Sequence, residues 1–260
     1  MISRLDVELA ARGLARSRSH ARELIDQRLV LVNGSVAGKA SQQIAEHDQL
    51  ELTEHDPYVS RAAYKLIGAL DDLGLSVPAR VLDAGASTGG FTQVLLERGS
   101  AEVIAIDVGH DQLHPLLRQD PRVIPYEGHN LRDLDLDLLD RRPVELVVAD
   151  VSFISLTLLL GPLTSVIGSG GRLLTMIKPQ FEVGRERLGK GGVVRTDALR
   201  RAGVQAVVEA AATIGWHPQA AARSRLPGPA GNVEYFVCFA SRPPAPGVID
   251  GLFDQDPAGR

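Results

Sequence analysis

A glycine-rich turn at residues 83–91 stands between a short apolar run and a helix-like segment. Glycines at such a turn let the backbone approach a ligand closely, and the first N–H groups of the following helix are unpaired. The spacing differs from G-x-G-x-x-G and from a P-loop, because an acid, Asp83, enters the turn and no lysine follows. A carboxylate beside the turn repels pyrophosphate and suits a cationic or hydroxyl-bearing ligand.

A second acid, Asp107, ends the next apolar run about 20 residues further on, where a carboxylate would accept both hydroxyls of a ribose. Adenosine without phosphates, carrying an amino-acid tail, suits both acids and points to S-adenosylmethionine. A nicotinamide dinucleotide is the alternative, and the glycine spacing argues against it. Asn130, beyond a further predicted strand, is assigned to the adenine pocket. The expected cofactor-binding residues are Asp83, Gly85, Ala86, Ser87, Thr88, Gly89, Gly90, Phe91, Asp107 and Asn130.

Charged side chains end several of the predicted strands, and an α/β sheet binds its ligands at the carboxyl ends of its strands. Asp150 and Lys178 each follow an apolar run, and Glu234 lies within another near the end of the chain. Lys65 stands in an apolar helix, where a buried unpaired ammonium would be costly, although it could also extend to solvent. Each residue alone could be a water-facing side chain, whereas all four together predict a polar site.

The elements that must position these residues alternate between apolar strands and amphipathic segments from residue 59 onward. This pattern is typical of a doubly wound, Rossmann-like α/β fold with helices on both faces of the sheet. The expected strands are 81–83, 103–107, 123–125, 146–150, 172–177, a stretch near Gln219, and 233–239. The expected helices are 60–73, 91–97, 156–167 and 197–214.

The N-terminal segment reads as a separate, small α+β module. Residues 1–45 carry seven basic and four acidic side chains, a local net charge of +3 in a chain whose net charge is −4. Gly13 can end a first helix, Ser17 can cap a second, and Asn33-Gly34 is a preferred two-residue hairpin turn. The arginines could form only a solvated surface; contact with RNA is the other interpretation.

Composition narrows the class of protein further. With 260 residues and 44% hydrophobic content, the chain can form one ordinary domain and one small one. We expect a cytoplasmic monomer without a membrane span or disulfide, because the start is charged, no apolar run reaches about 18 residues, and Cys238 is the single cysteine. His110 and His114 have no obvious third partner, so no metal site is expected.

Several motifs resemble known families. Ser17-Arg18, Val30 to Gly34 and their neighbours resemble the RNA-binding module named after small-subunit ribosomal protein four. Lys65, Asp150, Lys178 and Glu234 match the Lys-Asp-Lys-Glu tetrad of the FtsJ-like ribose 2′-O-methyltransferases, in order and setting. The whole chain resembles the TlyA family, which joins the two modules. The matching segments of the second module are 60–66, 83–92, 149–156, 177–184 and 227–236.

The resemblance implies a function and a division of the chain. Family members are bacterial enzymes that methylate a cytidine 2′-hydroxyl in 16S and/or 23S ribosomal RNA, and some are labelled haemolysins. The implied RNA contacts are Arg4, Ser17, Arg18, Arg22 and Arg61. The expected parts are an RNA-binding domain at 1–56, a linker at 57–60, a class I, S-adenosylmethionine-dependent methyltransferase domain at 61–242, and a poorly ordered tail at 243–260.

The implied chemistry assigns roles to the tetrad. A ribose 2′-hydroxyl is a poor nucleophile until its proton is removed, so the protein must supply a base and an in-line geometry. Lys178 is the expected base, Asp150 and Glu234 position it and the hydroxyl, and Lys65 stabilises the developing charge or holds a phosphate. The partners are then ribosomal RNA or ribosomal subunits. A non-enzymatic RNA-binding or assembly protein with a vestigial methyltransferase fold is the alternative.

Overall fold

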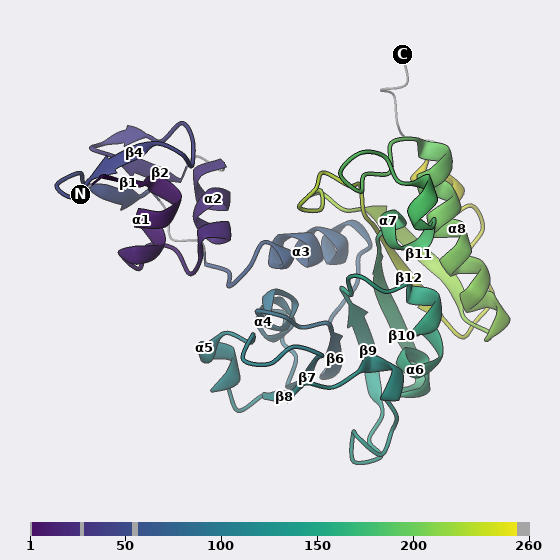
Figure 1. Ribbon diagram of the computed structural model, residues 1–260. Coiled ribbons are helices and arrows are strands. Elements are labelled where there is room, and N and C mark those ends of the chain that lie inside the picture. Colours follow the sequence, from purple (N-terminus) through teal and green to yellow (C-terminus); the bar gives the residue numbers. More distant parts are fainter. Residues whose placement is uncertain (1, 27–28, 54–56, 254–260) are drawn as a thin grey trace. The chain divides into compact units, whose positions relative to one another are not determined.

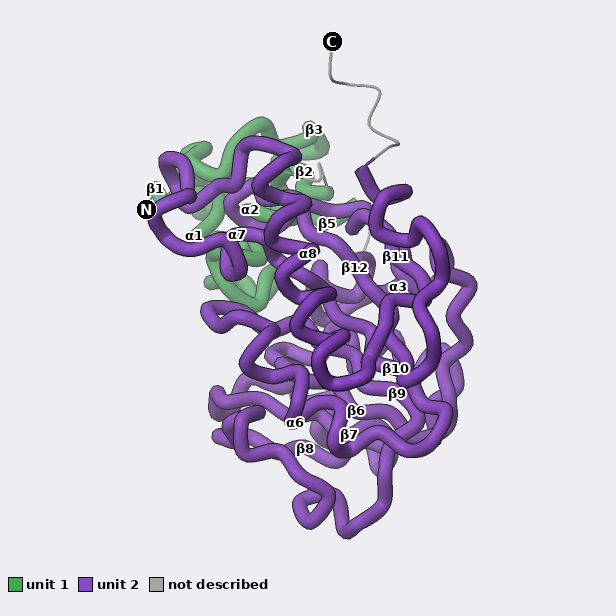
Figure 2. The backbone as a smooth tube through the Cα atoms, turned by 90° about the vertical axis from the view of Figure 1, so that its right-hand side faces the viewer, with its two compact units in different colours: residues 1–57 green, residues 58–260 purple. Residues whose placement is uncertain are grey.

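The computed structural model describes residues 2–26, 29–53 and 57–253 and shows two units, residues 1–57 and 58–260 (Figure 2). Their boundary lies within the linker expected at 57–60. Residues 54–56, which precede this linker, lie outside the described residues.

Unit 1 combines two helices with short antiparallel strands (Figure 1). Its strands β1 and β4 pair, and β3, β2 and β5 form a three-stranded sheet. Asn33 and Gly34 join β2 to β3 with φ values of 52° and 77°, so the predicted hairpin turn is confirmed. The elements are β1 (Ile2–Arg4), α1 (Leu5–Ala11), α2 (Arg18–Asp26), β2 (Val30–Val32), β3 (Ser35–Val36), β4 (Gln43–Ala45) and β5 (Leu50–Leu52).

Unit 2 is built on a seven-stranded sheet in the order β11-β12-β10-β9-β6-β7-β8. Neighbours from β10 to β8 pair in parallel, whereas β12 is antiparallel to both β10 and β11. The predicted Rossmann-like sheet is therefore confirmed, with the last strand inserted beside the fifth. The strands are β6 (Arg80–Ala84), β7 (Glu102–Asp107), β8 (Val123–Glu127), β9 (Val144–Ala149), β10 (Ile167–Ile177), β11 (His217–Arg223) and β12 (Tyr235–Ala240).

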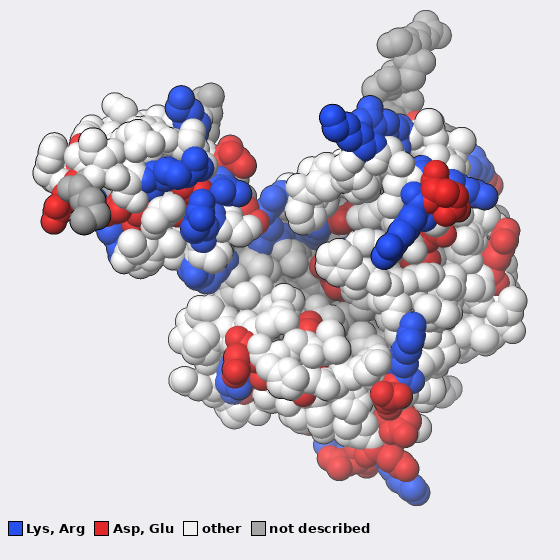
Figure 3. Space-filling model, viewed as in Figure 1, with Lys and Arg blue, Asp and Glu red and all other residues white. Residues whose placement is uncertain are grey.

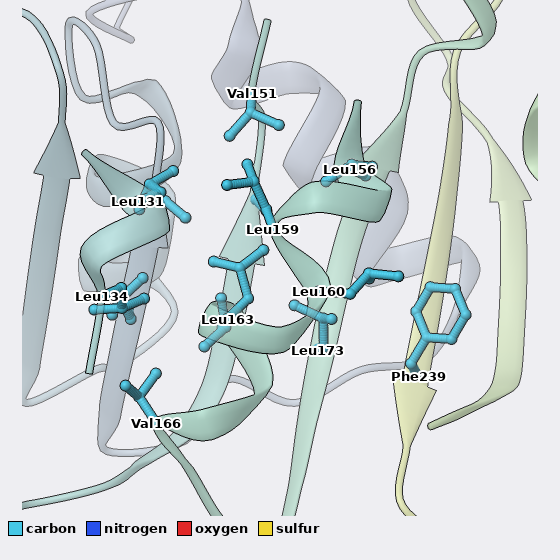
Figure 4. Close-up of a cluster of buried hydrophobic side chains, with 14 of the residues drawn as sticks. Leu131, Leu134, Val151, Leu156, Leu159, Leu160, Leu163, Val166, Leu173 and Phe239 are labelled. Atoms are coloured by element: carbon cyan, nitrogen blue, oxygen red, sulfur yellow. The ribbon is translucent and has the colours of Figure 1, made fainter. Parts of the chain in front are cut away.

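Helices cover both faces of this sheet, because alternate strand residues point to opposite sides and are apolar on each. One face packs against α3 (Ala62–Asp72), α4 (Gly90–Glu97) and α5 (Pro115–Arg118). The other packs against α6 (Leu160–Ser165) and α8 (Asp197–Thr213). Figure 4 shows the second cluster, in which Leu160 and Leu163 of α6 lie near Leu173 of β10. The short helix α7 (Pro179–Glu182) follows β10.

Two segments differ from the sequence-based expectation. The helix expected at 156–167 is a 3-10 turn, Leu156–Leu158, followed by the single short helix α6, and β10 already begins at Ile167. Pro162 lacks an N–H and Gly161 is a weak helix former, so a long helix is disfavoured there. The tail was expected to be poorly ordered, yet Ile249, Leu252 and Phe253 pack against the core of unit 2. Residues 254–260 lie outside the described residues.

Candidate active site

The strand order reverses around β6, which is where an α/β sheet opens a crevice for ligands. Ala84 of β6 pairs with Ala149 of β9, so Gly85 and Asp150 leave the sheet side by side. The backbone N–H of Asp150 donates to the carbonyl of Ala84 at 3.1 Å. The site therefore begins at the carboxyl ends of these two neighbouring strands.

Lys178 and Glu234 enter the same edge from the neighbouring pair of strands. Ile177, the last residue of β10, pairs with Tyr235, the first residue of β12. Lys178 follows and Glu234 precedes these paired positions, so the antiparallel insertion of β12 brings together two residues that are far apart in the chain. Both side chains line one cavity.

Lys65 reaches this edge from helix α3 and pairs with Glu234. Lys65 Nζ lies 2.6 Å from Glu234 Oε2, and both side chains are buried. A buried ammonium and carboxylate each require a partner, because removing either charge from water is expensive. Gly228 leaves room for this pair, since a Cβ at that position would lie 2.5 Å from Glu234 Oε1.

Lys178 has two oxygen neighbours. Its Nζ lies 2.6 Å from Asp150 Oδ1 in an ion pair and donates a hydrogen bond to Ser152 Oγ at 2.7 Å. The structure thus joins the four charged residues in two pairs, Lys65 with Glu234 and Lys178 with Asp150. Ser152 is not among the site residues predicted from the sequence. Its position two residues after Asp150 in a non-helical segment was the signal that the two side chains could share a neighbour.

A first cavity of about 520 Å³ opens at the ends of β6, β7 and β9. Asp107 is held in its wall by the N–H groups of Ser87 and Gly109, at 2.8 and 2.7 Å. Asn130 also lines the cavity; its amide oxygen accepts the N–H of Arg132 at 3.0 Å. Apolar walls with a few placed polar groups suit a nucleoside with an attached side chain. S-adenosylmethionine fits this set, since no cluster of basic side chains for a pyrophosphate lines the cavity among the described residues.

Only part of the predicted glycine-rich turn reaches this cavity. Gly85 and Ser87 line it, together with Asp107 and Asn130, whereas Asp83, Ala86, Thr88, Gly89, Gly90 and Phe91 do not. Asp83 is fully buried and accepts a hydrogen bond from Thr92 Oγ1 at 2.7 Å. Burial raises the pKa of Asp83 to about 7, and the charges of Asp150 and Asp107 act in the same direction. Asp83 therefore ties α4 to β6 beneath the cavity.

The two adjacent glycines of the turn serve helix packing. Gly89 has a left-handed φ of 96°. At Gly90 a Cβ would lie 3.0 Å from the backbone nitrogen of Ala63, so glycine allows α4 to approach α3. Phe91 is buried in the cluster between these helices and the sheet. The sequence could not separate glycines that approach a ligand from glycines that approach a helix.

Other residues in the walls were not predicted from the sequence. Val108, Gln112, Phe153 and Ile154 line the first cavity. Gln112 accepts a hydrogen bond from Ser87 Oγ at 3.2 Å. Val108 and Phe153 are apolar and 70% and 92% exposed. Exposed apolar side chains beside a cavity are a structural signal of ligand contact that sequence periodicity does not contain.

A second cavity of about 500 Å³ shares the wall formed by Ser152, Phe153 and Ile154 with the first. Its floor carries Lys178 and Glu234. Phe153 adopts a left-handed φ of 65°, which an aromatic residue rarely does, and its ring lies 5.4 Å from that of Phe181. The second cavity therefore combines charged groups with two aromatic rings next to the first cavity.

The shared wall is tied to helix α7. Glu182 accepts hydrogen bonds from Ser155 Oγ at 2.5 Å and from the N–H of Leu156 at 3.0 Å. Burial raises the pKa of Glu182, although both hydrogen bonds oppose that shift. Because α7 directly follows Lys178, the contact links the segment that carries Phe153 to the strand end that carries the lysine.

The five residues expected to contact RNA lie in both units. In unit 1, Arg4, Arg18 and Arg22 all donate to Asp6, and Ser17 Oγ accepts the N–H of His20 at 3.2 Å as the predicted helix cap. Arg61 belongs to unit 2 and precedes the first residue of α3. Figure 3 shows Lys and Arg side chains grouped over α1 and α2 of unit 1.

Comparisons with known proteins agree with both units. Residues 58–241 match the FtsJ-like methyltransferase family, and residues 3–50 match the S4 domain. The 16S/23S rRNA (cytidine-2′-O)-methyltransferase TlyA of Mycobacterium tuberculosis is 47% identical over 238 residues, 90% of this chain and 88% of the relative. Hemolysin A of Brachyspira hyodysenteriae is 37% identical over 91% of this chain and 99% of its own.

A solved structure supports the same fold. A putative hemolysin from Streptococcus thermophilus superimposes with a TM-score of 0.78 at 35% identity, covering 98% of this chain and 95% of that one. The fold and its two adjoining cavities define an α/β methyltransferase. The chain belongs to the TlyA family, in which an S4 domain precedes an FtsJ-like methyltransferase domain. Within the described residues, no helix has both the length and the hydropathy to cross a membrane.

Proposed function

We propose that the protein transfers a methyl group from S-adenosylmethionine to the 2′-hydroxyl of a cytidine in 16S or 23S ribosomal RNA. The observation that carries this proposal is the wall Ser152 to Ile154, which lies between the cavity that suits the cofactor and the cavity that contains Lys178 and Glu234. A methyl donor on one side and a ribose on the other would meet at this wall. Bound S-adenosylmethionine supplies the activated methyl group.

Lys178 is the proposed base. As the ammonium of its ion pair with Asp150, Lys178 has no lone pair, so it has to release one proton to solvent before it can act as a base. The neutral amine then has two N–H donors and one lone pair, and its Nζ has two oxygen neighbours in Asp150 and Ser152. Donation to these two oxygens leaves the lone pair directed elsewhere, and Lys178 lines the second cavity. The lone pair can then accept the proton of a ribose 2′-hydroxyl placed there. Asp150 and Ser152 act as positioning residues for this amine.

Lys65 and Glu234 form the proposed second half of the catalytic group. Glu234 lines the second cavity and is held by the ammonium of Lys65. The carboxylate can accept a hydrogen bond from a ribose hydroxyl and so orient the sugar. The positive charge of Lys65 lies one hydrogen bond further away and favours negative charge developing on the attacking oxygen.

The aromatic rings supply a surface for the base of the target nucleotide. An enzyme that acts on a nucleotide within folded RNA has to expose that nucleotide, and a displaced base gains stabilisation by stacking on aromatic side chains. Phe153 is nearly fully exposed at the border of the two cavities, with Phe181 beside it. We assign Phe153 to contact with the target nucleotide.

The cofactor would be held mainly by Asp107, which is rigidly placed by two backbone N–H groups and can accept the ribose hydroxyls. Asn130 and the backbone at Gly85 and Ser87 complete the polar part of the first cavity. Unit 1 would hold the ribosomal RNA through its arginines, and Arg61 would add a contact from unit 2. This substrate places the reaction in the cytoplasm, with one chain sufficient because both cavities belong to unit 2.

The test is to map 2′-O-methylated cytidines in ribosomal RNA from cells with and without the gene. In vitro, labelled methyl transfer to isolated small and large subunits identifies the substrate. Labelled S-adenosylmethionine without any transfer to either subunit or to free ribosomal RNA would favour the alternative, a protein that binds RNA and has lost catalysis.

A further inference from the structure

Unit 1 contains one fully buried charged side chain among its described residues, Asp6 near the start of α1. Its carboxylate accepts hydrogen bonds from three arginines. Arg4 donates through Nε at 2.9 Å and Nη2 at 3.3 Å, Arg18 through Nη2 at 3.3 Å, and Arg22 through Nε at 3.1 Å. Residues from β1, α1 and α2 thus meet at one carboxylate, which we call the Asp6 hub.

The hub keeps Asp6 ionised in the folded protein. Its three guanidinium partners, with Arg4 contributing most, hold the pKa of Asp6 well below its usual range in spite of burial. A buried carboxylate without such partners would be destabilising. The single negative charge therefore stays buried beneath the three arginines at every pH near neutrality.

The arginines of the hub remain available to a ligand on their outer side. Their side chains are 41%, 56% and 54% exposed for Arg4, Arg18 and Arg22. Each guanidinium has five N–H donors, and the bonds to Asp6 use one or two of them. Three positive charges against one negative charge leave the group cationic, so it suits the phosphates of RNA.

Fixed arginines differ from mobile ones in what they can recognise. A long side chain that must be immobilised on binding costs affinity, and the hub has already restricted three of them. A flexible single strand can adapt to any arrangement of charge, whereas a folded RNA presents its phosphates in one arrangement. Asp6 itself repels phosphate in both cases.

We propose that Asp6 is a positioning residue for RNA recognition, which holds Arg4, Arg18 and Arg22 in the one arrangement that matches folded ribosomal RNA. This inference rests on the proposed RNA-binding role of unit 1 and goes beyond it. It requires that Asp6 has opposite effects on two kinds of RNA: the residue strengthens binding to a folded target and weakens binding to an unstructured one.

The experiment compares the full-length protein with Asp6→Asn in equilibrium binding to deproteinised ribosomal RNA and to poly(U). We expect Asp6→Asn to bind ribosomal RNA about tenfold more weakly and poly(U) as well as or better than the wild type. The slope of log Kd against log salt for ribosomal RNA should become shallower, because fewer arginines stay at phosphates. A purely structural role for Asp6 would weaken binding to both RNAs together.

Glu8→Gln is the matched control, since it removes one negative charge from the same helix. Glu8 pairs with Arg12 at 2.8 Å, and Arg12 is independently held by the backbone carbonyl of Asp48 at 2.7 Å. This variant should bind poly(U) slightly better and ribosomal RNA no worse. Equal behaviour of Asp6→Asn and Glu8→Gln on both RNAs overturns the proposal.

Amide hydrogen exchange in α1 and α2 would reveal whether Asp6→Asn unfolds unit 1. Asp6→Glu is a second variant that tests the same role. It keeps the charge and moves the carboxylate by one methylene, so we expect weaker binding to ribosomal RNA with unchanged binding to poly(U). Unchanged binding to both contradicts the positioning role. The binding experiment does not depend on methyl transfer. A protein that does not methylate ribosomal RNA would refute the proposed function, and the binding results would still test the role of Asp6.

Discussion

Lys65 and Glu234, 169 positions apart in the chain, form an ion pair with 2.6 Å between Nζ and Oε2. Helix α3 delivers one partner before the first strand of the sheet, and the residue before its last strand delivers the other. The pair therefore spans unit 2 from its beginning to its end. Loss of this ion pair would indicate that the residues of the proposed active site are no longer correctly arranged.

This pair can be disturbed without changing either of its residues. In Gly228→Ala the new Cβ would meet Glu234 Oε1 at 2.5 Å, so the carboxylate has to move away from Lys65. We expect kcat to fall about 10- to 100-fold, with little change in the dissociation constant of S-adenosylmethionine. Methyl-transfer kinetics and calorimetry measure the two quantities.

The control for that variant is Gly251→Ala in the 3-10 turn Asp250–Leu252, where a Cβ meets no atom within 4 Å. Gly251 does not have a left-handed φ, so this protein should be about as stable as the wild type, with unchanged kcat. Full activity of Gly228→Ala would show that the position of Glu234 does not matter for the reaction.

Lys178→Ala removes the proposed base. We expect kcat to fall by about 10²- to 10⁴-fold, while S-adenosylmethionine binding is largely retained because Lys178 does not line the first cavity. Single-turnover methyl transfer separates this loss from product release. Lys190→Ala, an exposed lysine of the following loop, is the control. Substantial remaining turnover would falsify the base assignment.

Phe153→Leu tests the aromatic surface. Leucine keeps an apolar side chain at the same left-handed position but cannot stack on a base, so kcat/KM for ribosomal RNA should fall about 5- to 100-fold. S-adenosylmethionine binding should change little, because leucine keeps an apolar side chain in the wall of the first cavity. Leu116→Ala, which removes an apolar side chain that is 74% exposed, should leave the kinetics unchanged. Wild-type kinetics for Phe153→Leu would exclude a stacking role.

Asp83 predicts a dependence of stability on pH. Its pKa is raised to about 7 in the folded protein, above the ordinary value of 3.8, so the folded state holds a proton that the unfolded state releases. The contribution of Asp83 to stability is therefore complete below about pH 4 and is lost as the pH rises to 7. At pH 8 we expect Asp83→Asn to be more stable than the wild type, by on the order of 1–4 kcal/mol.

Urea unfolding followed by fluorescence measures this effect, because Trp216 is the single tryptophan and packs in unit 2. At pH 4 the variant and the wild type should differ little, since both side chains are then neutral. Asp111→Asn, with a side chain that is 91% exposed, should show no such change between the two pH values. A constant difference between Asp83→Asn and wild type at all pH values would contradict the assignment.

Most of the fold could be predicted from the sequence, because it depends on local patterns. The strands of unit 2 are apolar runs, and the turn at Asn33-Gly34 has a specific conformational requirement that few other residues meet. The segment 156–167 was wrongly predicted as one helix, because its apolar residues suit a helix throughout and do not show that α6 begins only at Leu160 or that a strand begins at Ile167. The packing of the tail could not be predicted either. Its apolar residues are few, and the core residues that they contact lie far away in the sequence.

The residues of the candidate site could also be predicted only in part. Asp107 could be located from its place at a strand end, whereas Asp83 occupies a similar place and points beneath the cavity, because Thr92 holds its side chain there. The direction of a side chain at the end of a strand depends on the helix that follows. Gln112 and Phe153 belong to loops, whose paths carry no periodic signal. Ser152 and Asp6 owe their roles to partners that only the folded chain brings near.

In the proposed mechanism, the insertion of β12 between β10 and β11 sets the time at which catalysis can begin. A ribosome produces the chain from its N-terminus, so unit 1 and the parallel strands can fold while the final segment is still being made. Before Glu234 and β12 have been synthesised, Lys65 has no carboxylate partner. The backbone N–H and C=O groups on one edge of β10 are then also unpaired. On the proposed roles of Lys65 and Glu234, a nascent chain would therefore carry its S4 domain before it could methylate ribosomal RNA.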